Sequence, residues 1–325
     1  MSDDNPILSF AIPTWNRSKE LQECLDSIIR QIIDSKENIE IFISDNASTD
    51  ETPKVVQEYS KKYKFIRYSR NEKNIGPDLN FISVIEKSSG EYVWLFGDDD
   101  WLADGALKEI LRIIKNYKPC YISSNYYWLD KGDDGKYTIL KKQPQQKYMI
   151  DKDVNKAGIN DVFLQRNHWL SFMSPNIFDK QYMNFDEYKL NVEKVQYWIQ
   201  VYMVAQILAK QNCGYISSYY AVMARLGNGR VNTSAFIKSM PNSFDYIFKK
   251  FNVDKKVQKK VIKGIRKTFV PFKSWLKNRD MKNVSPLLIP YYYKMFSILP
   301  DNFINFAWKF KRFLKGKGFS LPKGS

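Results

Sequence analysis

The sequence predicts an α/β protein built on a doubly wound, mainly parallel sheet, followed by a C-terminal basic helical region. First, short apolar runs alternate with amphipathic segments through the first 130 residues, which is typical of a parallel sheet covered on both faces. Second, 44% of the 325 residues are hydrophobic and 15% are aromatic, enough for a buried core. Third, basic residues concentrate near the C-terminus.

Five apolar runs are the expected strands of this sheet. They are residues 8–12, 39–44, 65–69, 92–96 and 120–124. The segments between them carry apolar residues at three- and four-residue spacing, which predicts helices. Asp50 is the expected N-cap of the second helix and Pro77 opens the third. A fourth is expected at residues 104–116.

The chain beyond this alternation is less regular. Residues 130–165 are polar and indicate a loop or hairpin. A strand is expected at residues 169–178, a long apolar helix at 195–209 and a flexible polar loop at 227–234. From Lys249 the pattern is one of basic helices interrupted by prolines.

The net charge of +16 is unevenly distributed. Residues 249–325 hold 20 Lys and Arg but three Asp, so they carry +17 and the remaining chain carries −1. Three widely separated cysteines, Cys24, Cys120 and Cys213, indicate neither a disulfide framework nor a metal cluster, which favours a reducing cytosol. No secretory signal or membrane-spanning run is evident, which predicts a soluble or peripheral protein.

Four polar segments follow the expected strands, where ligands bind in parallel sheets. They are residues 13–17 (PTWNR), 45–50 (DNASTD), 73–76 (KNIG) and 97–101 (GDDDW). Three adjacent carboxylates after a buried strand repel one another unless a cation lies among them, and hard oxygen ligands suit Mg²⁺ or Mn²⁺. The alternative for the aspartate run is a solvated turn or helix cap.

Together these segments resemble family 2 glycosyltransferases of the GT-A fold, of the bacterial polysaccharide type. The resemblance implies an inverting, metal-dependent transfer from a nucleotide sugar, UDP-linked, to a hydroxyl of a glycan acceptor. It implies a catalytic domain at residues 1–235, with a donor half at 1–130 and an acceptor half at 131–235. Residues 236–325 form the basic, aromatic-rich helical region.

The resemblance also assigns residues to the donor site. Pro13, Thr14 and Asp45 would hold the nucleotide base, with Arg17 and Asn74 close by. In one register Asp99 is the principal ligand of Mn²⁺ or Mg²⁺ and Asp98 faces the ribose. In the shifted register the pair is Asp98 and Asp100. Gly97 stands where the first aspartate of the usual family motif would fall in the first register.

A general base is needed to take the proton from the attacking hydroxyl. The family places it at the start of a helix about 90 residues past the aspartate motif, which implies Glu193, with Asp186 and Glu187 as reserves. Lys194 replaces an expected aspartate. The alternative is that all three acids serve helix dipoles at the surface.

Two arginines and one histidine complete the candidate set. Arg225 and Arg230 flank a glycine-containing loop and could contact the leaving diphosphate, although a plain solvated loop is the alternative. His168 is the single histidine, which excludes histidine triads and multi-histidine zinc sites.

The basic C-terminal region mixes lysines with aromatic residues, as helices that bind anionic membrane surfaces do. We therefore expect a peripheral protein at the cytoplasmic face of the membrane, with a polyprenyl-phosphate-linked acceptor. Nucleic-acid binding would use similar residues but leaves the strand-end motifs unexplained, so no nucleic-acid partner is expected. A sugar-phosphate nucleotidyltransferase would show a glycine-rich signature after its first strand. A catalytically inactive relative that acts as an assembly partner is the other alternative.

Overall fold

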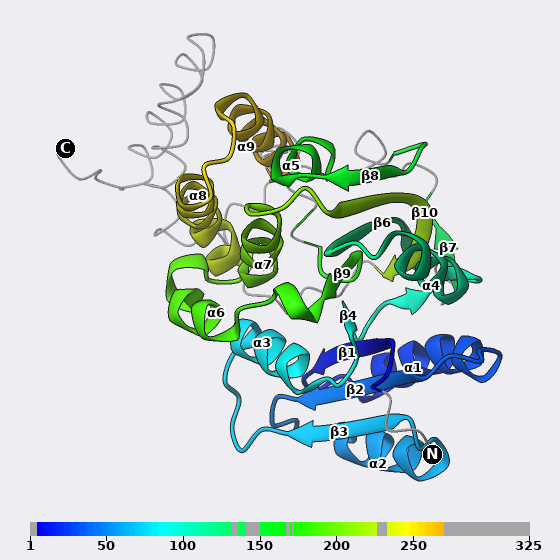
Figure 1. The fold of residues 1–325 in the computed structure, drawn as a ribbon. Coiled ribbons are helices and arrows are strands. Elements are labelled where there is room, and N and C mark those ends of the chain that lie inside the picture. The colour runs from blue at the N-terminus through cyan, green and yellow to red at the C-terminus, as the bar shows by residue number, and fades with distance from the viewer. Residues whose placement is uncertain are drawn as a thin grey trace, which may run out of the picture. The chain divides into compact units, whose positions relative to one another are not determined.

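The computed structural model of the protein describes residues 5–131, 136–140, 150–166, 170, 172–225 and 233–269 (Figure 1). These residues belong to one compact unit that ends at Phe269. Its centre is a ten-stranded sheet whose main path runs β3-β2-β1-β4-β9-β6-β10-β5. The strands of this path are β1 (Leu8–Thr14), β2 (Ile39–Asp45), β3 (Ile66–Arg70), β4 (Tyr92–Leu95), β5 (Trp101–Leu102), β6 (Tyr121–Lys131), β9 (Asn176–Asp179) and β10 (Gly214–Arg225).

The sheet is mainly parallel, as predicted. Along the main path, six strands run in one direction and the two short strands β5 and β9 run in the other. β7 (Tyr137–Ile139) extends β6 and β8 (Val154–Ala157) extends β10, both antiparallel. The polar segment expected as a loop or hairpin therefore contributes two edge strands.

Helices cover both faces of the sheet. They are α1 (Ser18–Ile33), α2 (Thr52–Lys62), α3 (Pro77–Lys87), α4 (Ala106–Tyr117), α5 (Ile159–Arg166), α6 (Phe185–Asn191), α7 (Ile199–Leu208), α8 (Thr233–Lys250) and α9 (Lys255–Phe269), with 3-10 turns η3 (Lys180–Tyr182) and η4 (Val192–Val195). Because strand side chains alternate between faces, Phe10 and Ile12 pack with α1 and α4, while Ala11 packs with α3 and α7. The doubly wound prediction is thereby confirmed.

Several boundaries differ from the predictions. The strand expected at 169–178 is confined, among the described residues, to β9, which begins just after Pro175. The helix expected at 195–209 is divided into η4 and α7, because Tyr197 adopts a left-handed φ of 66°. Asp50 is not an N-cap: α2 begins at Thr52, whose amide donates to the Asp50 carboxylate at 3.0 Å.

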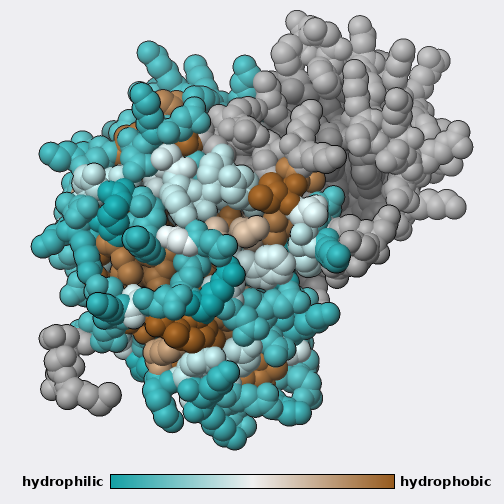
Figure 2. All heavy atoms as spheres, turned by 90° about the vertical axis from the view of Figure 1, so that its right-hand side faces the viewer, coloured by the Kyte–Doolittle hydropathy of each residue, from teal (hydrophilic) through white to brown (hydrophobic). Residues whose placement is uncertain are grey.

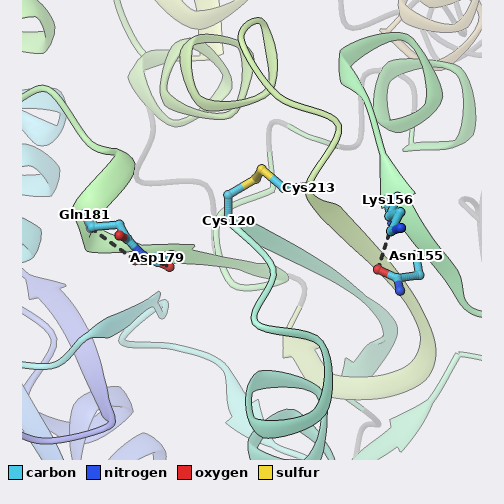
Figure 3. The surroundings of a disulfide bond; sticks show 6 residues. All are labelled: Cys120, Asn155, Lys156, Asp179, Gln181 and Cys213. Atoms are coloured by element: carbon cyan, nitrogen blue, oxygen red, sulfur yellow. Dashed lines mark hydrogen bonds between the residues drawn. A yellow bond between two sulfur atoms is a disulfide. The ribbon is translucent and has the colours of Figure 1, made fainter.

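The cysteine prediction is wrong for two of the three residues. Cys120, just before β6, and Cys213, just before β10, form a disulfide with their Cα atoms 5.4 Å apart (Figure 3). The parallel pairing of β6 with β10 begins at Tyr121 opposite Gly214, so it brings the two preceding cysteines together from 93 residues apart. Cys24 is free and buried.

Helices α8 and α9 belong to the compact unit. Phe244, Phe248, Val257 and Val261 are buried in the same core as α7, so the unit continues beyond residue 235. The remainder of the basic region, residues 270–325, lies outside the described residues.

In the described part of the chain, no helix combines the length and apolar character needed to cross a membrane. On the face shown in Figure 2, hydrophilic residues dominate and hydrophobic residues form separate patches.

Candidate active site at the carboxyl ends of the strands

A pocket of about 450 Å³ lies where the parallel strands of the donor half end. Thr14 at the end of β1 is in register with Asp45 at the end of β2, so the segments that follow them start side by side. Residues from both halves line the pocket. They are Pro13, Thr14, Trp15, Arg17, Asn46, Asn74, Pro77, Asp78, Asn80, Phe81, Asp98, Asp99, Asp100, Phe172, Met173, Tyr197 and Gln200.

The aspartate run is held in a tight turn after β4. The Asp100 amide donates to the Gly97 carbonyl at 3.2 Å, and the Gly97 amide donates to Ser174 Oγ at 2.9 Å. A Cβ atom on residue 97 would lie 2.8 Å from Asp100 Oδ2. A larger residue at position 97 would therefore require Asp100 to move.

The three carboxylates have different partners. Asp98 accepts a hydrogen bond from Thr14 Oγ1 at 2.8 Å. Asp99 pairs with Arg17, whose Nη1 is also 3.5 Å from Asp98 Oδ1. Asp100 faces inward, because it accepts from Ser174 Oγ and from the Arg225 amide.

The run carries unfavourable negative charge. Burial raises the pKa of Asp98 and of Asp100, and the neighbouring charge of Asp99 raises both further. Arg17 opposes this effect at Asp98. A cation among these carboxylates would relieve the repulsion.

These carboxylates fit an open Mg²⁺ or Mn²⁺ site, in which one or two protein carboxylates share the ion with substrate phosphates and water. Asp98 and Asp99 line the pocket, and Asp99 has the more exposed side chain, 24% against 10%. A closed cage is not available, because the described residues contain no group of three acidic, histidine or cysteine side chains able to hold a metal.

The second strand end forms its own polar network. Asp45 is fully buried: it accepts from the Tyr68 hydroxyl at 2.7 Å and from the Ser48 amide at 2.8 Å. The next residue, Asn46, reaches the pocket and donates to Asn74 Oδ1 at 2.9 Å. The motifs at 45–50 and 73–76 are therefore hydrogen-bonded to each other, and the pocket-facing member of the first is Asn46.

The three candidate general bases do not line the pocket. Glu193 in η4 and Asp186 in α6 are exposed. Glu187 joins three helices, because it accepts from the Tyr202 hydroxyl and pairs with Lys250. Burial opposes ionisation of Glu187, but these contacts hold its pKa below the usual value.

Arg225 lies behind the aspartate run. Its guanidinium pairs with Glu23 and is 5.1 Å from the Trp101 ring centroid, and its Nε donates to the Asp99 carbonyl. The side chain is 4% exposed and is not among those that line the pocket. Arg230 and His168 lie outside the described residues.

The comparisons with known proteins agree with this geometry. A family model described as glycosyl transferase family 2 matches residues 9–171, half of the chain. The chain belongs to this family. The predicted family is thereby confirmed, and the match contains all four strand-end motifs.

Two curated relatives of this family 2 glycosyltransferase resemble part of the chain. Abequosyltransferase RfbV of Salmonella typhimurium is 38% identical over 167 residues, 49% of this chain and 47% of RfbV. The GalNAc(5)-diNAcBac-PP-undecaprenol beta-1,3-glucosyltransferase of Campylobacter jejuni is 38% identical over 108 residues, 33% of this chain and 34% of that enzyme. The aligned segments thus span about half and about a third of these relatives.

Solved glycosyltransferases share the fold. The complex of S. aureus TarS 1-349 with UDP-GlcNAc superposes with a TM-score of 0.61 at 16% identity, covering 89% of this chain and 79% of TarS. The mannosyltransferase PcManGT of Pyrobaculum calidifontis, in complex with GDP-Man and Mn²⁺, gives 0.56 at 11% identity, covering 94% and 84%. The GT-A fold predicted for this family 2 chain is confirmed.

The sequence did not mark several residues that line the pocket. Trp15 was part of a recognised motif, yet its 44% exposure at the pocket was not anticipated. The sequence does not mark Asp78 as a site residue, because an acid in the first turn of a helix is common. Tyr197 and Gln200 lie in a segment whose pattern predicts an apolar helix, and no local feature of the sequence indicates that they line a pocket.

Proposed function

We propose that this family 2 glycosyltransferase transfers a hexosyl residue from a UDP-linked sugar to a hydroxyl of a glycan acceptor, with inversion at the anomeric carbon. The observation that carries the proposal is the pocket in which Asp98 and Asp99 meet Thr14, Arg17 and Asn74. Anionic carboxylates beside an arginine and polar amides suit a diphosphate shared with a divalent cation.

In the first register Asp99 would hold Mn²⁺ or Mg²⁺ while Asp98 faces the ribose, and in the shifted register the pair would be Asp98 and Asp100. When bound, the ion would neutralise the charge that develops on the leaving diphosphate. Arg17 is placed to orient the leaving diphosphate, because its guanidinium lies between Asp98 and Asp99. Asp45, through its fixed turn, and the ring of Trp15 are proposed to hold the nucleotide base, with Pro13.

The donor and acceptor classes are supported by similar proteins. TarS is described in complex with UDP-GlcNAc. The Campylobacter relative is named for an undecaprenol-diphosphate-linked acceptor. By analogy we propose a UDP-sugar donor and a polyprenyl-phosphate-linked acceptor for this chain.

The general base is proposed to be Glu193, with Asp186 and Glu187 as reserves. Glu193 precedes the pocket-lining Tyr197 by four residues in the same segment. Because Glu193 does not line the pocket, this role requires η4 to move. Arg230 is proposed to act on the leaving diphosphate, whereas Arg225, which does not line the pocket, would act only by holding the aspartate run from behind.

The experiment is a transfer assay with a panel of UDP- and GDP-linked sugars, with Mn²⁺, Mg²⁺ or a chelator. Expected are turnover with a UDP-sugar, loss of turnover in excess chelator and a product of inverted anomeric configuration by NMR. Full activity in chelator would overturn the metal dependence, and a retained configuration would overturn the inverting mechanism.

The second candidate function is a catalytically inactive assembly partner. It is favoured by Lys194, which stands where the family has an aspartate and lies over the Tyr246 ring at 5.3 Å. This candidate predicts nucleotide-sugar binding without turnover for every donor and acceptor tested.

Membrane docking is proposed for the basic region, at the cytoplasmic face. Because α9 contributes Val257 and Val261 to the core, a truncation to test this should end after Phe269. Residues 270–325 hold 11 Lys and Arg against two Asp, so their removal should abolish sedimentation with anionic vesicles while preserving nucleotide-sugar binding. Binding of the full chain should weaken with salt, since exposed charges are screened within about 8–10 Å.

The proposed cytoplasmic location makes a prediction about the cysteines. A reducing compartment keeps such a pair as thiols, so the disulfide between Cys120 and Cys213 counts against the proposed location, and thiol trapping in cell extracts tests it. Their recovery as a disulfide in cells would contradict this location.

A further inference from the structure

Asp78 connects the donor half to the acceptor half across the pocket. It is the second residue of α3, next to Pro77, and is 7% exposed. Its carboxylate accepts hydrogen bonds from the Tyr197 amide at 2.7 Å and the Ile199 amide at 3.4 Å. Its oxygens therefore accept hydrogen bonds from a segment about 120 residues further along the chain.

These two bonds fall on a strained piece of backbone. Tyr197 has a φ of 66°, which is rare for a bulky side chain and persists only where the surroundings enforce it. The carboxylate of Asp78 supplies such a constraint, because a charged acceptor forms a stronger hydrogen bond than a neutral one.

The same carboxylate caps α7. Trp198, the N-cap residue, provides no side-chain hydrogen bond to this helix. Asp78 instead accepts from Ile199, the first helical residue, and brings negative charge to the positive end of the helix dipole. A residue of the donor half thus fixes both the start and the direction of an acceptor-half helix.

The segment held in this way forms one wall of the pocket. Tyr197 and Gln200 line it, together with Phe81 from the turn of α3 that follows Asp78. The aspartate run lines the same pocket. The distance between Asp78 and this wall is therefore set by hydrogen bonds and not by packing alone.

We propose that Asp78 is a positioning residue for acceptor binding, which acts by holding Tyr197 and Gln200 in the wall of the pocket. The inference rests on the proposed function, because it takes this wall as the place where the acceptor glycan binds. Burial raises the pKa of Asp78 to about 6, against the opposing hydrogen bonds of Tyr197 and Ile199. The side chain is therefore still ionised near pH 7.5 and remains a strong acceptor.

The first test is kinetic and uses Asp78→Ala in the full chain. We expect the KM for the acceptor to rise at least about tenfold, while the dissociation constant of the donor UDP-sugar changes less than about twofold. The control is Asp161→Ala, which removes a first-turn aspartate of α5 that accepts from the Gly158 amide at 2.9 Å and does not line the pocket. It should change neither constant.

A double-mutant cycle separates positioning from general destabilisation. Glycine adopts a left-handed φ at little cost, so Asp78→Ala should have less than about a twofold effect on the acceptor KM in a Tyr197→Gly background. Additive effects of the two substitutions would overturn the proposal. So would a lower kcat with both KM values unchanged, which would indicate a direct role in the chemistry.

Amide hydrogen exchange tests the contact without relying on turnover. Exchange at Tyr197 and Ile199 should accelerate at least about tenfold in Asp78→Ala and not in Asp161→Ala. Unchanged exchange would overturn the proposal even if transfer is impaired. A wild-type protein without transfer to any acceptor would instead remove the proposed function, while exchange would still report on the hydrogen bonds.

Discussion

The donor and acceptor halves of the pocket differ in how closely their residues follow from strand order. On the donor side, Thr14, Asn74 and Asp98 come from three separate segments and meet as predicted. On the acceptor side, Glu193 and Asp186 lie outside the pocket, while Tyr197 and Gln200 line it. The carboxyl ends of parallel strands share an edge, whereas no such rule places the residues of the acceptor half.

The contacts of the two sides differ in the same way. The aspartate run is fixed by a local turn, by Thr14 on the neighbouring strand and by several bonds to Ser174 and Arg225. At the opposite wall, the Asp78 carboxylate of α3 reaches across to accept a hydrogen bond from the Tyr197 amide. Substitutions on the donor side should therefore lower transfer with every substrate. Those on the acceptor side should lower transfer to some acceptors more than to others.

The largest effect is expected for Asp99→Asn. Loss of the carboxylate that is proposed to hold the ion on the diphosphate should lower transfer at least about 10³-fold, with the fold intact by circular dichroism. The control is Asp104→Asn, whose carboxylate is 88% exposed and pairs with Arg30 at the surface. Equal activity of the two variants would contradict the assignment of the aspartate run.

The next largest effect is expected for Glu193→Gln. Loss of a general base should lower kcat about 100-fold and leave donor affinity unchanged, measured by steady-state kinetics and calorimetry. Wild-type turnover would move the role to Asp186 or Glu187, which the corresponding variants would test. Full activity in all three would leave the acceptor half without a base among the predicted residues.

A smaller effect concerns the pH dependence of stability through Asp78. Its native pKa of about 6 lies above the unfolded value near 4, so the folded state binds the proton more tightly. This stabilisation is present below pH 4 and is lost as the pH rises through 6. Relative to Asp78→Asn, the free energy of unfolding of the wild type should fall by up to about 3 kcal/mol between pH 4 and 7, measured by denaturant titration. A pH-independent difference would contradict the raised pKa.

The smallest effect is expected at Asp45. Asp45→Asn should weaken UDP binding about tenfold for every UDP-sugar alike, because the turn that Asp45 fixes is proposed to hold the base that these donors share. Tyr68→Phe is the matched control, because it removes the 2.7 Å hydrogen bond to Asp45 and keeps the carboxylate. If the control weakens binding equally, the role of Asp45 is to hold its turn, and Asn46 becomes the pocket contact.

The sequence by itself determined the order of strands and helices, the GT-A class and the donor-side motifs. Apolar periodicity reports burial on each face, and a short polar segment at a strand end is placed by the strand. For this reason the residues at 13–17, 45–50, 73–76 and 97–101 could be assigned to one edge before any contact was known.

Only the tertiary structure decided the acceptor wall, the disulfide and the break before α7. Each depends on residues far apart in sequence: Asp78 with Tyr197, and Cys120 with Cys213. The apolar pattern of residues 195–209 is compatible with one continuous helix, and the interruption arises because Tyr197 is left-handed and bonded to α3. Local propensity is a weak preference that such long-range contacts override.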